Sequence, residues 1–159
     1  RLVRAQPAYE AYDEGRQALR DGDAGLALSK ADEAIDVEPD EAIFHGLRGD
    51  ALVAGKDFGR ADRAYTQALR LDPDWFYHHL RRGQARAELD RLPEARGDLE
   101  ASIDRMPTAV AHLALGHVER RAGNRERAID HYRTAARSDT PTGQRARQAL
   151  RELGAAAID

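Results

Sequence analysis

Small and apolar side chains recur along the chain with the spacing of one face of an α-helix. In the second quarter of the sequence, the residues that follow an i, i+3, i+4, i+7 spacing are Leu52, Ala61, Ala64, Tyr65, Ala68 and Leu69. Similar stripes continue along most of the chain, with short breaks between them. The pattern therefore predicts a succession of helices of about 13 residues each.

The helical pattern returns at a nearly constant interval. Four prolines mark it most clearly, because each lies 34 residues after the last: Pro39, Pro73, Pro107 and Pro141. Glycines and alanines keep almost the same step, at Gly15, Gly49, Gly83 and Gly116 and at Ala27, Ala61, Ala95 and Ala128. A period of about 34 residues is typical of stacked helix pairs. We expect these small side chains to let the two helices of each pair approach closely.

This period divides the chain, which we treat as a single domain over residues 1–159, into four units and one further helix. The units are expected over residues 8–41, 42–75, 76–108 and 109–141. Residues 142–153 predict an amphipathic helix whose apolar face covers the exposed edge of the fourth unit. Its other face is charged, as a terminal cap of a repeat array should be.

The breaks between helices carry residues that favour helix ends. Glycine, which tolerates the left-handed backbone of a C-cap, stands where three first helices should end, at Gly22, Gly55 and Gly123. Good N-cap residues for the second helices follow at Asp23, Asp57 and Asn124. Candidate caps for the next units follow the prolines, at Asp40, Asp74 and Thr108.

The composition fits closely packed helices with solvated outer faces. Hydrophobic residues make up 42% and charged residues 33% of the 159 residues, and aromatic residues only 6%. The net charge of −3 is too small to indicate nucleic acid or an anionic membrane as the partner. Residues 1–80 carry 10 basic and 16 acidic residues, whereas residues 81–159 carry 15 and 12. This asymmetry is either chance variation or a device that orients a partner.

The sequence also excludes some kinds of covalent and metal chemistry, but it leaves the redox compartment open. It contains no cysteine, so disulfides and thiolate metal sites are excluded. No stretch approaches the roughly 18 apolar residues of a membrane-spanning helix. The segment Arg1–Pro7 lacks an initiator methionine and is too polar for a signal peptide, so we expect an excised domain or a processed product.

The repeated positions resemble those of the tetratricopeptide repeat (TPR) family over residues 8–141. The second unit matches best, through Gly49, Leu52, Ala61, Tyr65, Ala68 and Pro73. The resemblance implies an all-α, right-handed solenoid of four helix-turn-helix repeats with a C-terminal capping helix. It also implies a non-catalytic module that binds a peptide segment or a partner helix in its concave groove.

Three runs resemble a narrower group, the TPR regions that follow the catalytic domain of bacterial envelope HExxH zinc metallopeptidases. The runs cover residues 44–50, 75–83 and 106–116. The chain itself contains no HExxH. This resemblance implies the region that recruits a substrate or an assembly partner, located in the periplasm or the cell envelope, and the cytoplasm remains an alternative.

In TPR arrays the first helix of each unit lines the concave face. The positions expected there, as the peptide-binding groove, are Tyr9, Tyr12, Arg16, Ile43, Asp50, Tyr77, Leu80, Gln84, Leu113 and His117. We expect Gly46 to leave a gap in this surface where a partner side chain could insert. The occupant is a partner protein or peptide, or another part of the same polypeptide such as its catalytic domain, or the groove has no ligand.

Chaperone-binding TPR domains clamp a terminal carboxylate with lysine and asparagine at set places on three first helices. The corresponding places in this chain hold Tyr12, Arg16, Leu47, Tyr77 and Arg81. Only Arg81 suits that role, so the resemblance implies that the clamp is absent.

No residue pattern indicates catalysis, and we expect neither a metal nor a cofactor. His78 and His79 are adjacent, so their side chains point about 100° apart on a helix and cannot easily share one ion. His112 and His117 are poorly spaced for a common face, and His131 belongs to another helix. We expect His45 to be a satisfied interior residue, and no phosphate-binding glycine loop appears. A free-standing adaptor or assembly factor, an enzyme lid and a self-associating structural protein remain rival interpretations.

Overall fold

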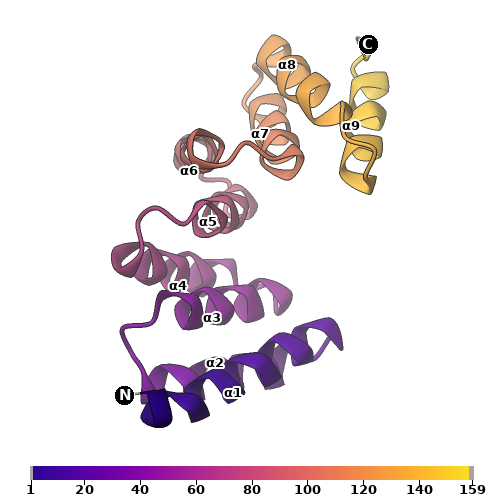
Figure 1. Cartoon of the computed structure of the whole chain (residues 1–159). Helices are drawn as coiled ribbons and strands as arrows, with labels where there is room; N and C mark the ends of the chain where they lie inside the picture. Colours follow the sequence, from indigo (N-terminus) through magenta and orange to yellow (C-terminus); the bar gives the residue numbers. More distant parts are fainter. Residues whose placement is uncertain (1, 158–159) are drawn as a thin grey trace.

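The structure is a computed structural model that describes residues 2–157 and contains helices and turns but no strand in that range. The helices are α1 (Leu2–Arg20), α2 (Ala24–Val37), α3 (Ala42–Ala54), α4 (Phe58–Leu71), α5 (Phe76–Glu88), α6 (Leu92–Arg105), α7 (Ala109–Arg121), α8 (Arg125–Ala136) and α9 (Pro141–Glu152). They stack in chain order into a curved array, with the two termini at opposite ends (Figure 1). The predicted all-α solenoid of helix pairs is confirmed.

Two helix ends differ from the repeat boundaries expected from the proline spacing. α1 begins at Leu2, well before residue 8, and contains Pro7. α9 begins at Pro141, because proline is favoured in the first turn of a helix, where its missing N–H is not needed.

Glycine lets the paired helices approach as closely as the sequence predicts. A Cβ atom added to Gly49 would lie 2.5 Å from the ring of Tyr65, and one added to Gly116 would lie 2.5 Å from the ring of Tyr132. In the third pair, a Cβ on Gly83 would lie 2.9 Å from Leu99. In these three pairs the bulky residue of the second helix therefore occupies the space that glycine leaves on the first.

The predicted C-caps are confirmed at two of three turns. Gly22 has φ 78° and Gly123 has φ 84°, both in the left-handed region. The prediction for Gly55 is wrong, since its φ is −84° and the next residue, Lys56, takes the left-handed conformation with φ 60°. The turn is thus shifted by one residue, at the cost of placing a side chain where glycine is preferred.

Side-chain caps are likewise confirmed in part. Asp23, Asp57 and Thr108 each accept a hydrogen bond from a backbone N–H in the first turn of the next helix. Asn124 occupies an N-cap position, but its amide donates to Glu119. Asp40 and Asp74 are not the caps, because α3 and α5 are preceded directly by Glu41 and Trp75, neither of which makes a side-chain cap bond.

A buried ion network joins the second and third helix pairs. Asp98 of α6, only 5% exposed, accepts two bonds from Arg82 and one from Arg86, both of α5. Arg86 also donates to Asp62 of α4. The two carboxylates and two guanidinium groups satisfy one another, so charge and packing fix how successive pairs stack.

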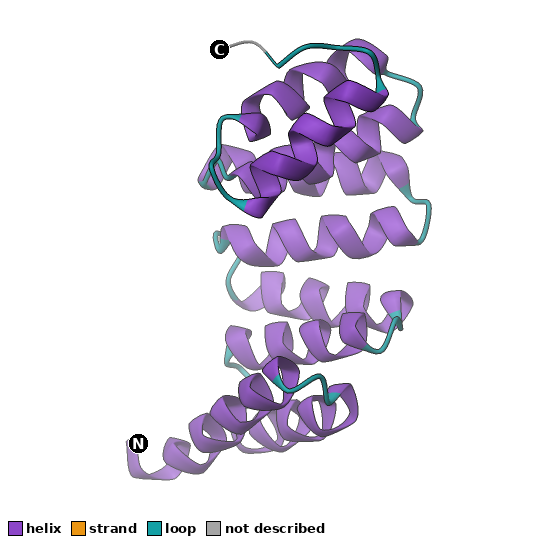
Figure 2. Ribbon diagram, turned by 90° about the vertical axis from the view of Figure 1, so that its right-hand side faces the viewer, coloured by secondary structure: helices purple, strands orange, loops and turns teal. Residues whose placement is uncertain are grey.

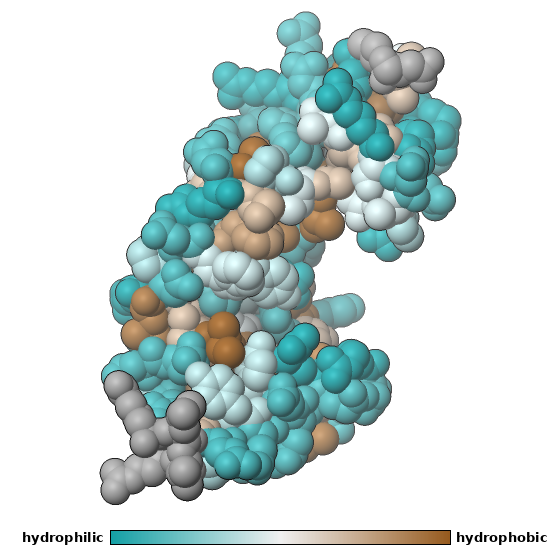
Figure 3. Space-filling model, viewed as in Figure 1, coloured by the Kyte–Doolittle hydropathy of each residue, from teal (hydrophilic) through white to brown (hydrophobic). Residues whose placement is uncertain are grey.

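The first helices of the pairs face one side of the curve. α1, α3, α5, α7 and α9 contact one another in succession and line the concave side. Figure 2 views the array from that side. Figure 3 shows this side, at the right, hollowed between the N-terminal helices and α9. Across the described residues, no helix combines the length and hydropathy needed to cross a membrane.

Candidate functional site

The concave face contains two hollows, which together form the candidate site. The first, the N-terminal hollow, has a volume of about 510 Å³ and lies between α1, α3 and the start of α5. Its lining includes Tyr12, Arg16, Leu19, Arg20, Ile43, Asp50, Trp75 and Tyr77. Aromatic rings therefore lie beside charged side-chain groups, so the hollow can bind both the apolar and the hydrogen-bonding groups of one ligand.

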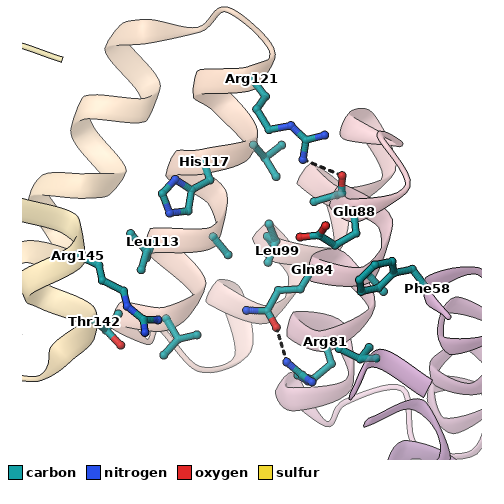
Figure 4. Close-up of a pocket in the computed structure, with 16 residues that line it drawn as sticks. Phe58, Arg81, Gln84, Glu88, Leu99, Leu113, His117, Arg121, Thr142 and Arg145 are labelled. Carbon is teal, nitrogen blue, oxygen red and sulfur yellow. Dashed lines mark hydrogen bonds between the residues drawn. The ribbon is translucent and has the colours of Figure 1, made fainter. Parts of the chain in front are cut away.

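The second hollow, the C-terminal pocket, has a volume of about 490 Å³ and lies chiefly between α5, α7 and α9 (Figure 4). Its lining includes Phe58, Gln84, Glu88, Val110, Leu113, His117, Arg121 and Arg145. Figure 4 shows that α9 contributes Thr142 and Arg145 to its edge, so the capping helix is part of the site.

A hydrogen-bond hub at Asp50 lies at the boundary between the two hollows. Its carboxylate accepts bonds from the hydroxyl groups of Tyr65 and Tyr77 and from Arg81 Nε, the last at 3.1 Å. Arg81 Nη1 also donates to Gln84 Oε1 at 3.0 Å. Burial and the negative charge of Asp50 raise the pKa of Tyr77 to about 12, so Tyr77 remains a neutral donor.

Most of the predicted groove residues lie in the two hollows. Tyr12, Arg16, Ile43, Asp50 and Tyr77 line the N-terminal hollow, and Gln84, Leu113 and His117 line the C-terminal pocket. Tyr9 lines neither hollow; it is 42% exposed and its hydroxyl donates to Glu41. Leu80 is only 5% exposed and packs in the core with Leu99, so it offers little surface to a ligand.

Several lining residues did not emerge from the sequence. Trp75, Arg20, Arg121 and Arg145 are the clearest examples. Arg20 and Arg121 each lie four residues after a predicted groove position, which is one helical turn further on the same face. Because residues four apart share one face of a helix, this spacing could have identified both arginines as groove residues. Nothing in the repeat pattern pointed to Arg145, because it belongs to the capping helix.

The gap expected at Gly46 is filled from within the protein. A Cβ atom on Gly46 would lie 2.3 Å from Nε2 of His78, which is 2% exposed. The glycine therefore makes room for a side chain of α5, and the expectation that a partner side chain inserts there is wrong.

The other histidines mostly make internal contacts. His45 is buried and its Nε2 lies 2.7 Å from the carbonyl oxygen of Pro39, which confirms it as a satisfied interior residue. His112 of α7 and His131 of α8 meet with their Nδ1 atoms 3.1 Å apart, a pairing that the sequence did not reveal. One ring must donate and the other accept, so the contact requires at least one neutral imidazole. Among the described residues, no group of three potential ligands could hold a metal ion.

Acidification is expected to destabilise the fold between about pH 7 and pH 5. Burial lowers the pKa of His78, His112, His117 and His131, and the neighbouring His131 lowers that of His112 further. Histidines in the unfolded chain titrate with a pKa of about 6.5. Below that pH the unfolded chain therefore binds more protons than the folded chain, so these histidines lower the free energy of unfolding only below about pH 6.5. Each proton of difference lowers the free energy of unfolding by about 1.4 kcal/mol per pH unit.

Urea unfolding at several pH values measures this loss. The variant His112→Gln, His131→Gln should show a smaller drop than the parent chain over the same range. An equal drop in both would mean that the histidine pair does not contribute.

Comparison with known proteins gives one consistent family. The profile described as tetratricopeptide repeat matches residues 12–61, 49–109 and 113–159, which is most of the chain. The chain is 26% identical over 138 residues to the mitochondrial import receptor subunit TOM70 of Rattus norvegicus, covering 84% of this chain and 22% of that protein. The chain spans no more than about a quarter of the length of the curated relatives it matches.

Two solved structures show how widely the fold is shared. The chain resembles MamA from Desulfovibrio magneticus RS-1 with a TM-score of 0.82 and 24% identity, covering 93% of this chain and 84% of that one. It resembles the second TPR domain of human RPAP3, solved in complex with the HSP70 peptide SGPTIEEVD, with a TM-score of 0.69 and 25% identity. That match covers 72% of this chain and 96% of the RPAP3 domain.

Proposed function

Because the chain belongs to the tetratricopeptide repeat family, we propose that it is a non-catalytic module that binds a segment of a partner protein on its concave face. Proteins with this fold are typically non-catalytic binding modules. The observation that carries the proposal is the pair of hollows, in which aromatic and aliphatic side chains lie beside hydrogen-bonding groups on one open surface.

The partner is expected to be held differently from a chaperone tail. The RPAP3 domain was solved with a peptide that ends in EEVD. In this chain Leu47, at one of the clamp places, is buried, and Arg81 is bound to Asp50. Neither is available to a terminal carboxylate, so we propose that internal side chains of the partner provide most of the contacts.

Two matched double variants test the site. Trp75→Ser with Val110→Ser removes exposed apolar groups from the two hollows, whereas Leu26→Ser with Met106→Ser removes equally exposed groups outside them. Affinity capture from cells of the source organism should recover the same bound protein with the parent chain and the outer variant. The hollow variant should lose most of it, because an apolar anchor typically contributes about 1–3 kcal/mol to binding.

Melting curves serve as the control that both variants remain folded. Equal recovery of the bound protein by the two folded variants, or loss only with the outer variant, would contradict the concave face as the binding surface.

A narrower candidate is the recruiting region of a bacterial envelope zinc metallopeptidase, acting in the periplasm or the cell envelope. Its support is the resemblance of residues 44–50, 75–83 and 106–116 to that group. The test is the reading frame upstream of Arg1 in the source genome. An HExxH motif with a third metal ligand supports this candidate, and an upstream sequence without that motif contradicts it.

A further inference from the structure

The concave face carries a charge opposite to that of the whole chain. Five arginines line the two hollows: Arg16, Arg20, Arg81, Arg121 and Arg145. Of the acidic residues that the structure describes, only Asp50 and Glu88 line them, although the chain as a whole has a net charge of −3. The acidic excess of the protein therefore lies elsewhere, and the open face is basic.

The arginines differ in how far they are already neutralised. Arg81 is bound to Asp50, and Arg121 donates to Asp90 and to the carbonyl oxygen of Ala87. Arg145 of α9 is exposed and makes no ion pair within the part of the chain that the structure describes. Its charge is thus available to a ligand of the C-terminal pocket.

Apolar surface lies beside this free cation. Figure 4 shows Arg145 directed from α9 toward the region of Leu113 on α7, with Arg121 at the opposite edge of the pocket. Val110 is 41% exposed and lines the same pocket. A ligand that spans the pocket would meet aliphatic groups beside the guanidinium group of Arg145.

We infer that the C-terminal pocket binds an acidic amphipathic segment of a separate protein, with its aliphatic side chains on Val110 and Ala114 and a carboxylate on Arg145. This inference rests on the proposed function and adds the chemistry of the partner. Guanidinium groups bind carboxylates through paired, charge-assisted hydrogen bonds. The basic half of the chain, with 15 basic and 12 acidic residues over 81–159, steers such a segment toward this end.

Fluorescence anisotropy with designed peptides tests the inference. The probe is a short labelled peptide of glutamate and leucine, and its controls replace glutamate by lysine or leucine by serine. The parent chain should bind the probe, should bind it less tightly as salt increases, and should bind neither control. Arg145→Glu should weaken binding about tenfold or more, because it replaces an attractive contact by a repulsive one.

The matched control is Arg151→Glu, an exposed arginine of α9 that lies outside the pocket. It should change the affinity by less than about twofold, since a distant surface charge is screened. Three results would overturn the inference. The parent chain could fail to bind the probe, it could bind the lysine peptide equally well, or the Arg145→Glu variant could bind the probe as tightly as the parent chain.

Two further results separate this inference from the proposed function. In the first, the double variant Trp75→Ser, Val110→Ser fails to capture the natural partner while Arg145→Glu still captures it. That result would support the concave binding site and would contradict the inference that the bound segment is acidic. Light scattering of the parent chain should give a monomer. A dimer that Arg145→Glu dissociates would identify the occupant as the acidic half of a second copy and overturn the inference.

Discussion

Asp98→Ala is expected to lower the free energy of unfolding by about 3 kcal/mol, and the melting temperature by roughly 10 °C. The substitution leaves Arg82 without a carboxylate partner and Arg86 with only that of Asp62, and each of these arginine side chains is only 17% exposed. The charge of Arg82 then lacks full hydration and has no ion-pair partner. We place the effect at the lower end of the range for buried ion pairs because both arginines keep some contact with water.

Asp104→Ala provides the matched control for this prediction. It removes the same charge from the same helix, but Asp104 is exposed and joins no ion pair within the described residues. Its effect should be below about 0.5 kcal/mol. Calorimetric melting of both variants measures the difference. Similar stability of the two would show that the network does not hold the second and third helix pairs together.

Gly116→Leu is expected to cost about 3 kcal/mol and to displace the fourth helix pair. Even the first carbon of the new side chain would lie 2.5 Å from the ring of Tyr132, which is completely buried. The ring cannot move freely, since its hydroxyl lies 2.8 Å from Nδ1 of His117. Overpacking of this kind forces side chains out of their preferred rotamers.

Gly97→Leu makes the same change where space is available. No atom lies within 4 Å of a Cβ added at Gly97 in α6, so this variant should be as stable as the parent chain or slightly more stable. Chemical unfolding of the two variants gives the comparison. Equal stability would mean that the close helix contact at Gly116 is not required.

The helix pairs could be predicted from the sequence because the residues that repeat along the chain are also the residues that pack against each other in the fold. Gly49 and Gly116 follow the repeat and also meet the large rings of Tyr65 and Tyr132 in the structure. The turn at Gly55 could not be placed to the residue, since Lys56 accepts the left-handed backbone despite its side chain. The caps predicted at Asp40 and Asp74 are wrong because α3 and α5 begin only at Ala42 and Phe76, so Glu41 and Trp75 occupy the N-cap positions.

The candidate site was harder to predict. The repeat period indicates which face of a helix a residue lies on, but not which side chains from neighbouring helices cover it. Leu80 points from a first helix yet is covered by α6 and α7, and the space at Gly46 is taken by His78. Arg145 lies outside the repeats altogether. The asymmetry of charge along the chain was visible in the sequence, but its concentration on one face depends on the curvature of the array.

Site-specific photocross-linking tests the central claim most directly, which is that a partner segment occupies the concave face. A benzophenone amino acid is placed in turn at Trp75 and Val110, in the hollows, and at Leu26 and Met106, outside them. The account predicts that the partner recovered by affinity capture is cross-linked from Trp75 and Val110 and not from Leu26 and Met106. Cross-links to that partner from the outer positions alone would contradict it.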